Sequence, residues 1–140
     1  MHVAALKFKD PIRSIPVSIY IRYAPGSVLL GIVPEGWGDM EVELETGDSI
    51  DLIALFEQAI TRANHSQQSP DSSVLVHQFK NLDGGEEAAF VISPAIDSLD
   101  VSVERSDEGK LPFRISLEDA RDLVGALKTS ATLASASPPT

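Results

Sequence analysis

The sequence predicts an α+β fold made of two similar halves, each with four strands followed by a helix. Segments with strand-like patterns come in groups of four, and a segment with helical spacing of apolar residues follows each group. Corresponding segments lie about 70 residues apart, although few residues are identical between the halves. We therefore expect two antiparallel sheets braced by two helices.

The first half contains four candidate strands separated by turns. Apolar and polar residues alternate over 3–9, 17–23 and 40–46, which is typical of strands with one buried face, whereas 27–33 is a continuous apolar run. Pro and Gly residues between these segments favour turns, because Pro fixes φ and Gly admits positive φ. The four segments predict a meander.

A helix is predicted after the fourth strand, over residues 48–64. Apolar residues recur there at helical spacing, and either Asp48 or Ser49 can cap the first turn. The polar segment 64–72 that follows predicts a surface linker between the halves.

The same order of elements returns after the linker. The predicted strands are 73–79, 87–93, 99–105 and 111–115. A second helix is predicted over 116–130, where Ser116 and Asp119 form a variant of the capping box.

These elements predict a single domain over residues 1–128, with halves 1–63 and 73–128. Residues 129–140 lack periodicity and contain a single bulky apolar residue, Leu133, so they predict a disordered tail.

The composition excludes several classes of site. The 140 residues carry a formal net charge of −10, which disfavours nonspecific binding to nucleic acid and favours cationic partners. The absence of cysteine excludes disulfides and thiolate metal sites. No apolar run is long enough for a signal peptide or a membrane span, so we expect a cytoplasmic protein without membrane contact.

Local signatures of catalysis are absent from the chain. It lacks the patterns HExxH, GxSxG and GxxxxGK, and no GxGxxG opens a helix. We therefore expect neither enzymatic activity nor a cofactor. His77 shares a strand face with Leu75 and Phe79, which favours a histidine at the edge of the core over a catalytic or ligand role.

An acidic row is predicted on the strand 40–46, where Glu41, Glu43 and Glu45 point to one face at intervals of roughly 7 Å. The sequence favours a solvated face that prevents pairing between sheet edges. A docking surface for a cationic partner and a site for a metal or for acid–base catalysis remain as alternatives.

Trp37, which is the only tryptophan, lies between glycines in a predicted turn. It is either an anchor for an interface, since tryptophan dominates binding hot spots, or a lid that folds back over the sheet edge.

Basic and aromatic residues gather in residues 1–23, which carry a net charge of +3. Rings beside cations on a sheet are typical of surfaces that bind single-stranded nucleic acid. The alternative is that these cations balance charge within an acidic protein. The residues of this candidate surface are Lys7, Lys9, Tyr20, Arg22 and Tyr23.

The repeated order of four strands and a helix resembles the Whirly-type single-stranded DNA-binding fold. The strand-to-helix segment "PFRISLEDARDLVGAL" at 112–127 also resembles the end of the related positive cofactor 4-like coactivator domains. The resemblance covers residues 3–128 as an order of elements. It implies two packed four-stranded sheets braced by helices, and the binding of single strands.

The sequence favours a non-enzymatic binding or interaction module that associates with itself, most simply as a dimer. The alternative is a Whirly-like protein that binds single-stranded nucleic acid through Lys7, Lys9, Arg22 and Tyr20. A metal-dependent enzyme built on the three glutamates is a third hypothesis.

Overall fold

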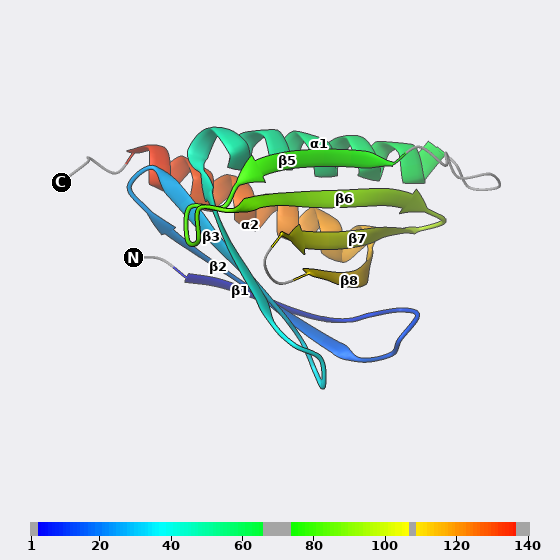
Figure 1. The fold of residues 1–140 in the computed structure, drawn as a ribbon. Helices are drawn as coiled ribbons and strands as arrows, with labels where there is room; N and C mark the ends of the chain where they lie inside the picture. The colour runs from blue at the N-terminus through cyan, green and yellow to red at the C-terminus, as the bar shows by residue number, and fades with distance from the viewer. Residues whose placement is uncertain (1–2, 66–73, 107–108, 137–140) are drawn as a thin grey trace.

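The computed structural model describes residues 3–65, 74–106 and 109–136, and it confirms the predicted α+β class (Figure 1). The first half comprises β1 (Val3–Lys9), β2 (Pro16–Ala24), β3 (Ser27–Pro34), β4 (Met40–Glu45) and α1 (Thr46–His65). The second half comprises β5 (Leu75–Lys80), β6 (Glu87–Ala95), β7 (Ser98–Arg105), β8 (Gly109–Ser116) and α2 (Leu117–Ala136). Each half forms an antiparallel sheet with its strands in chain order.

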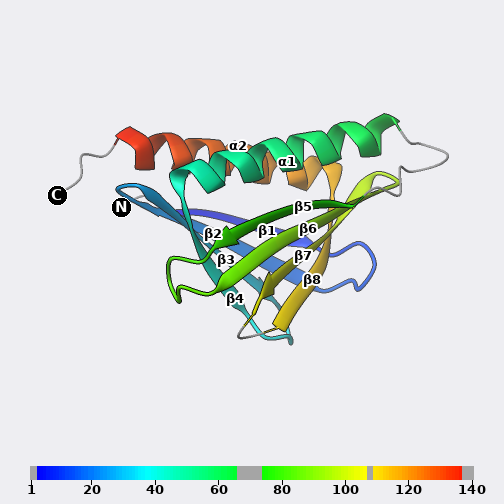
Figure 2. The same cartoon turned by 45° about the horizontal axis from the view of Figure 1, so that its top comes forward.

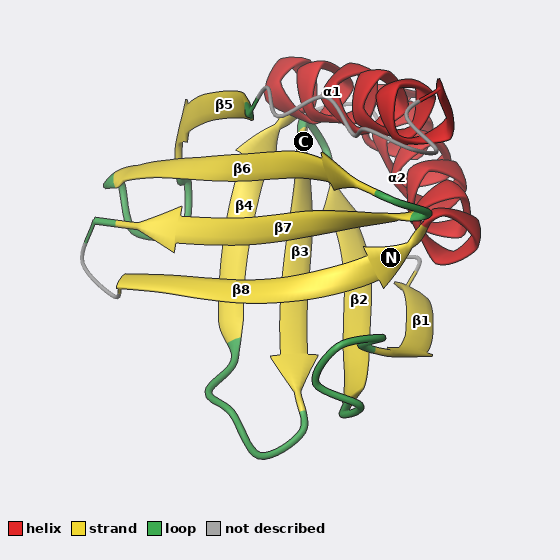
Figure 3. Ribbon diagram, turned by 90° about the vertical axis from the view of Figure 1, so that its right-hand side faces the viewer, coloured by secondary structure: helices red, strands yellow, loops and turns green. Residues whose placement is uncertain are grey.

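The two sheets face each other, and their strands run across one another (Figure 3). Alternate residues of each strand point into the space between the sheets, because side chains in a strand alternate between faces. In β2 these are Val17, Ile19 and Ile21, all almost fully buried. Their counterparts on β6 include Phe90 and Ile92. The apolar residues of the alternating pattern in the sequence thus lie on the inner faces of the sheets.

Each helix packs on the sheet of the other half. The contacts of α1 are mainly with β5 and β6, those of α2 are mainly with β1, β2 and β3, and the helices also lie against each other (Figure 2). Phe56 of α1, for example, meets Phe90 of β6 with ring centroids 6.5 Å apart. Neither half can therefore complete its own core. No helix among the described residues is long and apolar enough to cross a membrane.

The repeat has a constant spacing of 71 residues. Phe8 and Phe79 occupy equivalent places, as do the first residues of the two helices. The turns agree as well: Ser14 has a φ of 58°, and its equivalent is Gly85 with a φ of 77°. Asp97 likewise has a φ of 59° where the first half has Gly26 with a φ of 82°. The turns require a positive φ at these positions. In each pair of equivalent positions one half has glycine and the other has a polar residue, Ser14 or Asp97, that adopts the same conformation.

A buried polar residue follows the first strand of each half and reaches the edge of the other sheet. Asp10 accepts a hydrogen bond of 3.0 Å from the backbone N–H of Arg114 on β8. At the equivalent position, Asn81 accepts one of 2.8 Å from the backbone N–H of Glu43 on β4. Neither Asp10 nor Asn81 has any exposed surface. We call these two contacts the edge ties.

The edge ties correct, for the edges formed by β4 and β8, an assumption behind the predicted self-association, namely that the sheet edges are open. Besides its tie, the edge of β4 accepts a hydrogen bond from Arg105, whose Nη1 lies 2.9 Å from the carbonyl oxygen of Glu41. Arg13 Nη1 similarly donates to the carbonyl oxygen of Pro112 on β8, at 3.3 Å. Backbone groups of both edges are therefore occupied from within the molecule.

The predicted disordered tail, residues 129–140, is wrong for 129–136, because α2 continues to Ala136. Ser130, Ala131 and Ala134 are buried there. Small side chains let the backbone approach its neighbours closely, and the backbone N–H of Gly26 donates to the carbonyl oxygen of Ala134 at 3.1 Å. A segment made mostly of small residues can therefore be packed as part of a helix. Residues 137–140 lie outside the described part of the chain.

The predicted start of the first helix is also corrected. Helix α1 begins at Thr46, and the Ser49 hydroxyl donates to the carbonyl oxygen of Glu45 instead of capping the helix. The cap of α2 is as predicted, since the backbone N–H of Asp119 donates to the Ser116 hydroxyl at 3.1 Å. Helix α1 extends into the predicted linker 64–72 as far as His65, and the rest of that linker falls outside the described residues.

Candidate functional site

The acidic row lies on the outer face of the first sheet. As the alternation predicts, Met40, Val42 and Leu44 are buried while the three glutamates of β4 point away from the core. Glu41 and Glu43 are nevertheless half-buried, and Glu45 alone is exposed. The Ser27 hydroxyl donates to a carboxylate oxygen of Glu43 at 2.8 Å, so the row is partly engaged in local hydrogen bonds.

Glu41 accepts a hydrogen bond from the hydroxyl of Tyr20, which comes from two strands away. The register places Gly31 of β3 between them, and a Cβ atom at Gly31 would overlap the Tyr20 ring. The ring therefore crosses β3 over the glycine. Burial, followed by the hydrogen bond and negative charge of Glu41, raises the pKa of Tyr20 to about 12.

Cations and carboxylates share this outer face. Lys7 and Lys9 on β1 are exposed on it, and the Arg22 guanidinium lies 5.5 Å from the centroid of the Tyr20 ring. Tyr23 does not join them: it points to the opposite face and packs against the core, because it is an odd number of residues from Tyr20 in the same strand. The structure thus brings together four of the five residues of the candidate nucleic-acid surface.

Trp37 lies on the loop between β3 and β4, and 52% of it is exposed. This exposure favours the interpretation of Trp37 as an anchor for an interface over that of a lid on the core. The Arg13 guanidinium lies 5.1 Å from the centroid of its ring and is itself held by the Asp10 carboxylate at 3.2 Å. Ile12, which precedes Arg13, is 63% exposed. We call Ile12, Arg13 and Trp37 the Trp37 tip.

Trp37 itself borders a hollow of about 180 Å³ that ends against Lys110, Leu111 and Pro112 of β8. The loop of the second half that corresponds to the loop of Ile12 and Arg13 forms without either residue. In the second half, the equivalents of Ile12 and Arg13 are Asp83 and Gly84. The apolar and aromatic character of this tip therefore belongs to one half alone.

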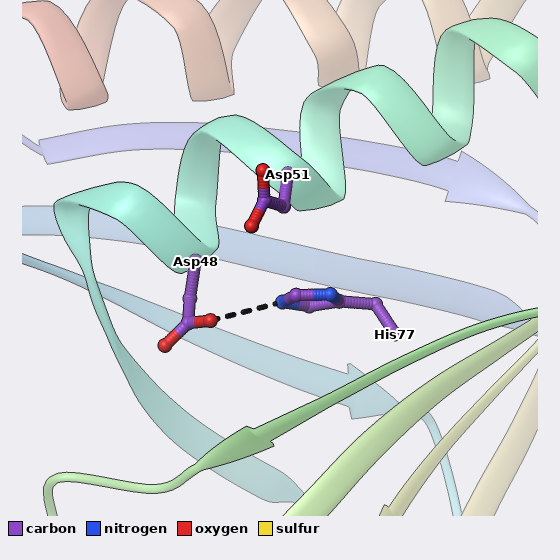
Figure 4. A group of neighbouring side chains, drawn as sticks. All are labelled: Asp48, Asp51 and His77. Carbon is purple, nitrogen blue, oxygen red and sulfur yellow. Dashed lines mark hydrogen bonds and ion pairs between the residues drawn. The ribbon is translucent and has the colours of Figure 1, made fainter.

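A third group of side chains joins the two halves (Figure 4). Asp48 and Asp51 lie one turn apart on α1, and both face His77 of β5. One atom capable of binding a metal from each of these residues lies within 4.8 Å of the others. His77 Nε2 lies 3.2 Å from Asp48 Oδ1, and the ring stacks on Phe79 with centroids 6.0 Å apart.

The half-buried His77 with its hydrogen bond agrees with the predicted histidine at the edge of the core. The two aspartates beside it were not predicted, because they come from a helix that belongs to the other half. Among the described residues, this group has the spacing of metal ligands, whereas the acidic row of β4 forms no such group.

Comparison of the chain with models of protein families and with the sequences of characterised proteins finds no match.

Proposed function

We propose that the protein is a non-enzymatic binding module that associates with a second copy of itself through the Trp37 tip. The observation that carries this proposal is the half-exposed Trp37, held in place by the Arg13 guanidinium. Tryptophan and arginine dominate the binding energy of protein interfaces, and a side chain already held in position loses less entropy on binding.

The charges around the tip favour a second copy as the partner. Arg13 lies beside Trp37, and the exposed carboxylates of Glu35 and Asp39 flank the same loop. In a two-fold contact the same surface meets itself, so Arg13 of one copy can approach the carboxylates of the other. Such pairs would offset the repulsion between two chains that each carry a net charge of −10.

The single tryptophan provides the experiment. Light scattering should give a mass above 15.0 kDa at micromolar concentrations, and the Trp37 emission should move to shorter wavelength as the concentration rises. Trp37→Ala should return the protein to the monomer. Ile96→Ala is the matched control, because Ile96 is 51% exposed in a turn of the other half.

Two outcomes would refute the proposal. The first is a mass of 15.0 kDa at every concentration. The second is an association that Trp37→Ala leaves intact, which would place the contact on another surface.

A second candidate function is the binding of single-stranded nucleic acid on the outer face of the first sheet. The observation in its favour is that Lys7, Tyr20 and Arg22 share this face. The acidic row on the same face opposes it. Titration of labelled single strands at two salt concentrations tests it, because binding through phosphates must weaken steeply with salt, and the charge reversal Lys7→Glu should abolish it.

A further inference from the structure

We propose that Asp48, Asp51 and His77 bind a divalent transition-metal ion that joins the two halves of the fold. The site would accept Zn²⁺, Co²⁺, Ni²⁺ or Cu²⁺. It is independent of the self-association proposed above, since the Trp37 tip lies on other loops.

The distances suit a shared ion. Carboxylate oxygens and imidazole nitrogens bind Zn²⁺ at about 2.0–2.2 Å, so neighbouring ligands of one ion lie roughly 3.0–3.5 Å apart. His77 Nε2 and Asp48 Oδ1 are 3.2 Å apart, and the third ligand atom, from Asp51, lies within 4.8 Å of both. Asp51 is exposed, so its side chain can rotate on binding to bring its carboxylate oxygen to the distance that a shared ion requires.

The donor set selects the class of metal. Imidazole favours Zn²⁺, Ni²⁺ and Cu²⁺, whereas Mg²⁺ and Ca²⁺ prefer oxygen ligands alone. Three protein ligands leave at least one coordination position to water. The N-terminal end of the α1 dipole carries about half an elementary positive charge, which would repel a cation. The two negative charges of Asp48 and Asp51 are about four times as large, so the site remains attractive to a cation.

Comparison of the two halves shows that the fold itself does not require this group of side chains. At the positions equivalent to Asp48 and Asp51, α2 has Asp119 and Asp122, with the same pattern of burial. The equivalent of His77 is Leu6. Both helices therefore carry two aspartates at equivalent positions, but only the sheet that faces α1 has a histidine at the position opposite them.

The caps of the two helices explain why Asp48 is available. In α2, Asp119 accepts a hydrogen bond of 2.9 Å from the Ser116 hydroxyl and belongs to the cap. Helix α1 has Glu45 in place of that serine, so Asp48 has no hydroxyl partner there and instead lies beside His77. His77 is held by packing between Phe79 and α1, which fixes the ring before an ion arrives.

Thermal unfolding with added ZnCl2, and with MgCl2 as a control, tests the site. An ion that binds only the folded chain should raise the Tm by about 5–10 °C at one hundred times its Kd, whereas Mg²⁺ should leave the Tm unchanged. Co²⁺ should give visible absorption bands with a stoichiometry of one. His77→Leu introduces the residue of the other half, so it should keep the fold and lose both effects, and Asp51→Asn should weaken binding at least tenfold.

The repeat also permits a gain of function. Leu6→His combined with Ser116→Glu, which removes the cap hydroxyl that holds Asp119 and introduces the residue of the first half, should place an imidazole opposite Asp119 and Asp122 and raise the Co²⁺ stoichiometry from one to two. The proposal is overturned if Zn²⁺ leaves the Tm of the unaltered protein unchanged. It is equally overturned if His77→Leu shows the same Tm shift and absorption, because the ion would then bind elsewhere on the acidic surface.

Discussion

Asp10→Ala should destabilise the protein more than the loss of any surface carboxylate. The Asp10 side chain is fully buried and accepts hydrogen bonds from the backbone N–H groups of Ile12 and Arg13, at 2.9 and 3.0 Å, within its own loop. It also accepts the N–H of Arg114 at 3.0 Å, across the gap between the sheets. The substitution thus removes both a loop anchor and one edge tie.

The magnitude follows from these contacts. A hydrogen bond to a charged group contributes about 1.5–3 kcal/mol, and an unsatisfied buried donor costs a similar amount. The N–H groups of the loop can turn to water, because Ile12 and Arg13 are exposed, whereas the N–H of Arg114 is held in the strand. We therefore expect a loss of about 2–4 kcal/mol, which is a large part of the stability of a domain of this size.

The pH dependence provides a second readout. Burial acts to raise the pKa of Asp10, but the hydrogen bonds from Arg13, Arg114 and Ile12 hold it below its ordinary value of 3.8. Asp10 therefore stabilises the fold fully above pH 3.8, and this contribution is lost as the pH falls through the lower folded pKa. The difference in free energy of unfolding between the protein and Asp10→Ala should shrink in that acid range.

Urea unfolding at pH 7 measures the loss, with Asp39→Ala as the control at an exposed aspartate. Asn81→Ala removes the other edge tie and should cost a comparable amount. A loss below about 0.5 kcal/mol for Asp10→Ala, the level of an ordinary surface change, would refute the role of the tie.

Three further predictions concern the core and the outer face. Phe56→Ala and Leu123→Ala should each cost about 2–5 kcal/mol by urea unfolding, because each opens a cavity between a helix and a sheet; strongly unequal losses would mean that one helix is peripheral. Replacing the three glutamates of β4 with glutamine should leave the Tm unchanged or slightly higher, and a collapse would contradict a structurally dispensable row. Gly31→Ala should displace the ring of Tyr20, so that ultraviolet titration finds the high tyrosine pKa of about 12 returned toward 10; persistence of the high value would refute the packing over Gly31.

Strands such as β2 and β4 could be predicted from the sequence because each has one buried face, which imposes a period of two. Strand β3 was predicted from its continuous apolar run, and Pro and Gly residues marked the turns between the strands. The helices were found by their apolar spacing, but the end of α2 was missed. Ser130 and Ala134 are buried there, but their small side chains give little hydrophobic signal in the sequence. The edge ties were missed for a related reason: Asp10 and Asn81 look like turn residues, and nothing in the sequence shows that their side chains reach across to the other half.

The candidate sites depend on the register of the repeat, which pattern alone does not fix. A spacing of about 70 residues aligns His77 with Lys7, which is an exposed cation on the outer face. The structural spacing of 71 aligns it with Leu6, which faces α2 as His77 faces α1. An error of one residue in the repeat spacing pairs side chains that lie on opposite faces of their strands. With that error, His77 would be compared with Lys7, and the difference between His77 and Leu6 at the two helix–sheet contacts would not be seen.

With the spacing of 71 residues, each position in one half can be compared with its equivalent in the other half. Asp10 and Asn81 serve the same tie, and Ser14 and Gly85 share a positive φ, so these positions are explained by the shared backbone. Where equivalent positions differ while the backbone stays the same, the fold does not dictate the residue. Ile12, Arg13 and His77 belong to this second class, since their counterparts are Asp83, Gly84 and Leu6 in the described part of the other half. Stability alone therefore does not account for them, and it is at these positions that substitution should change binding while leaving the fold intact.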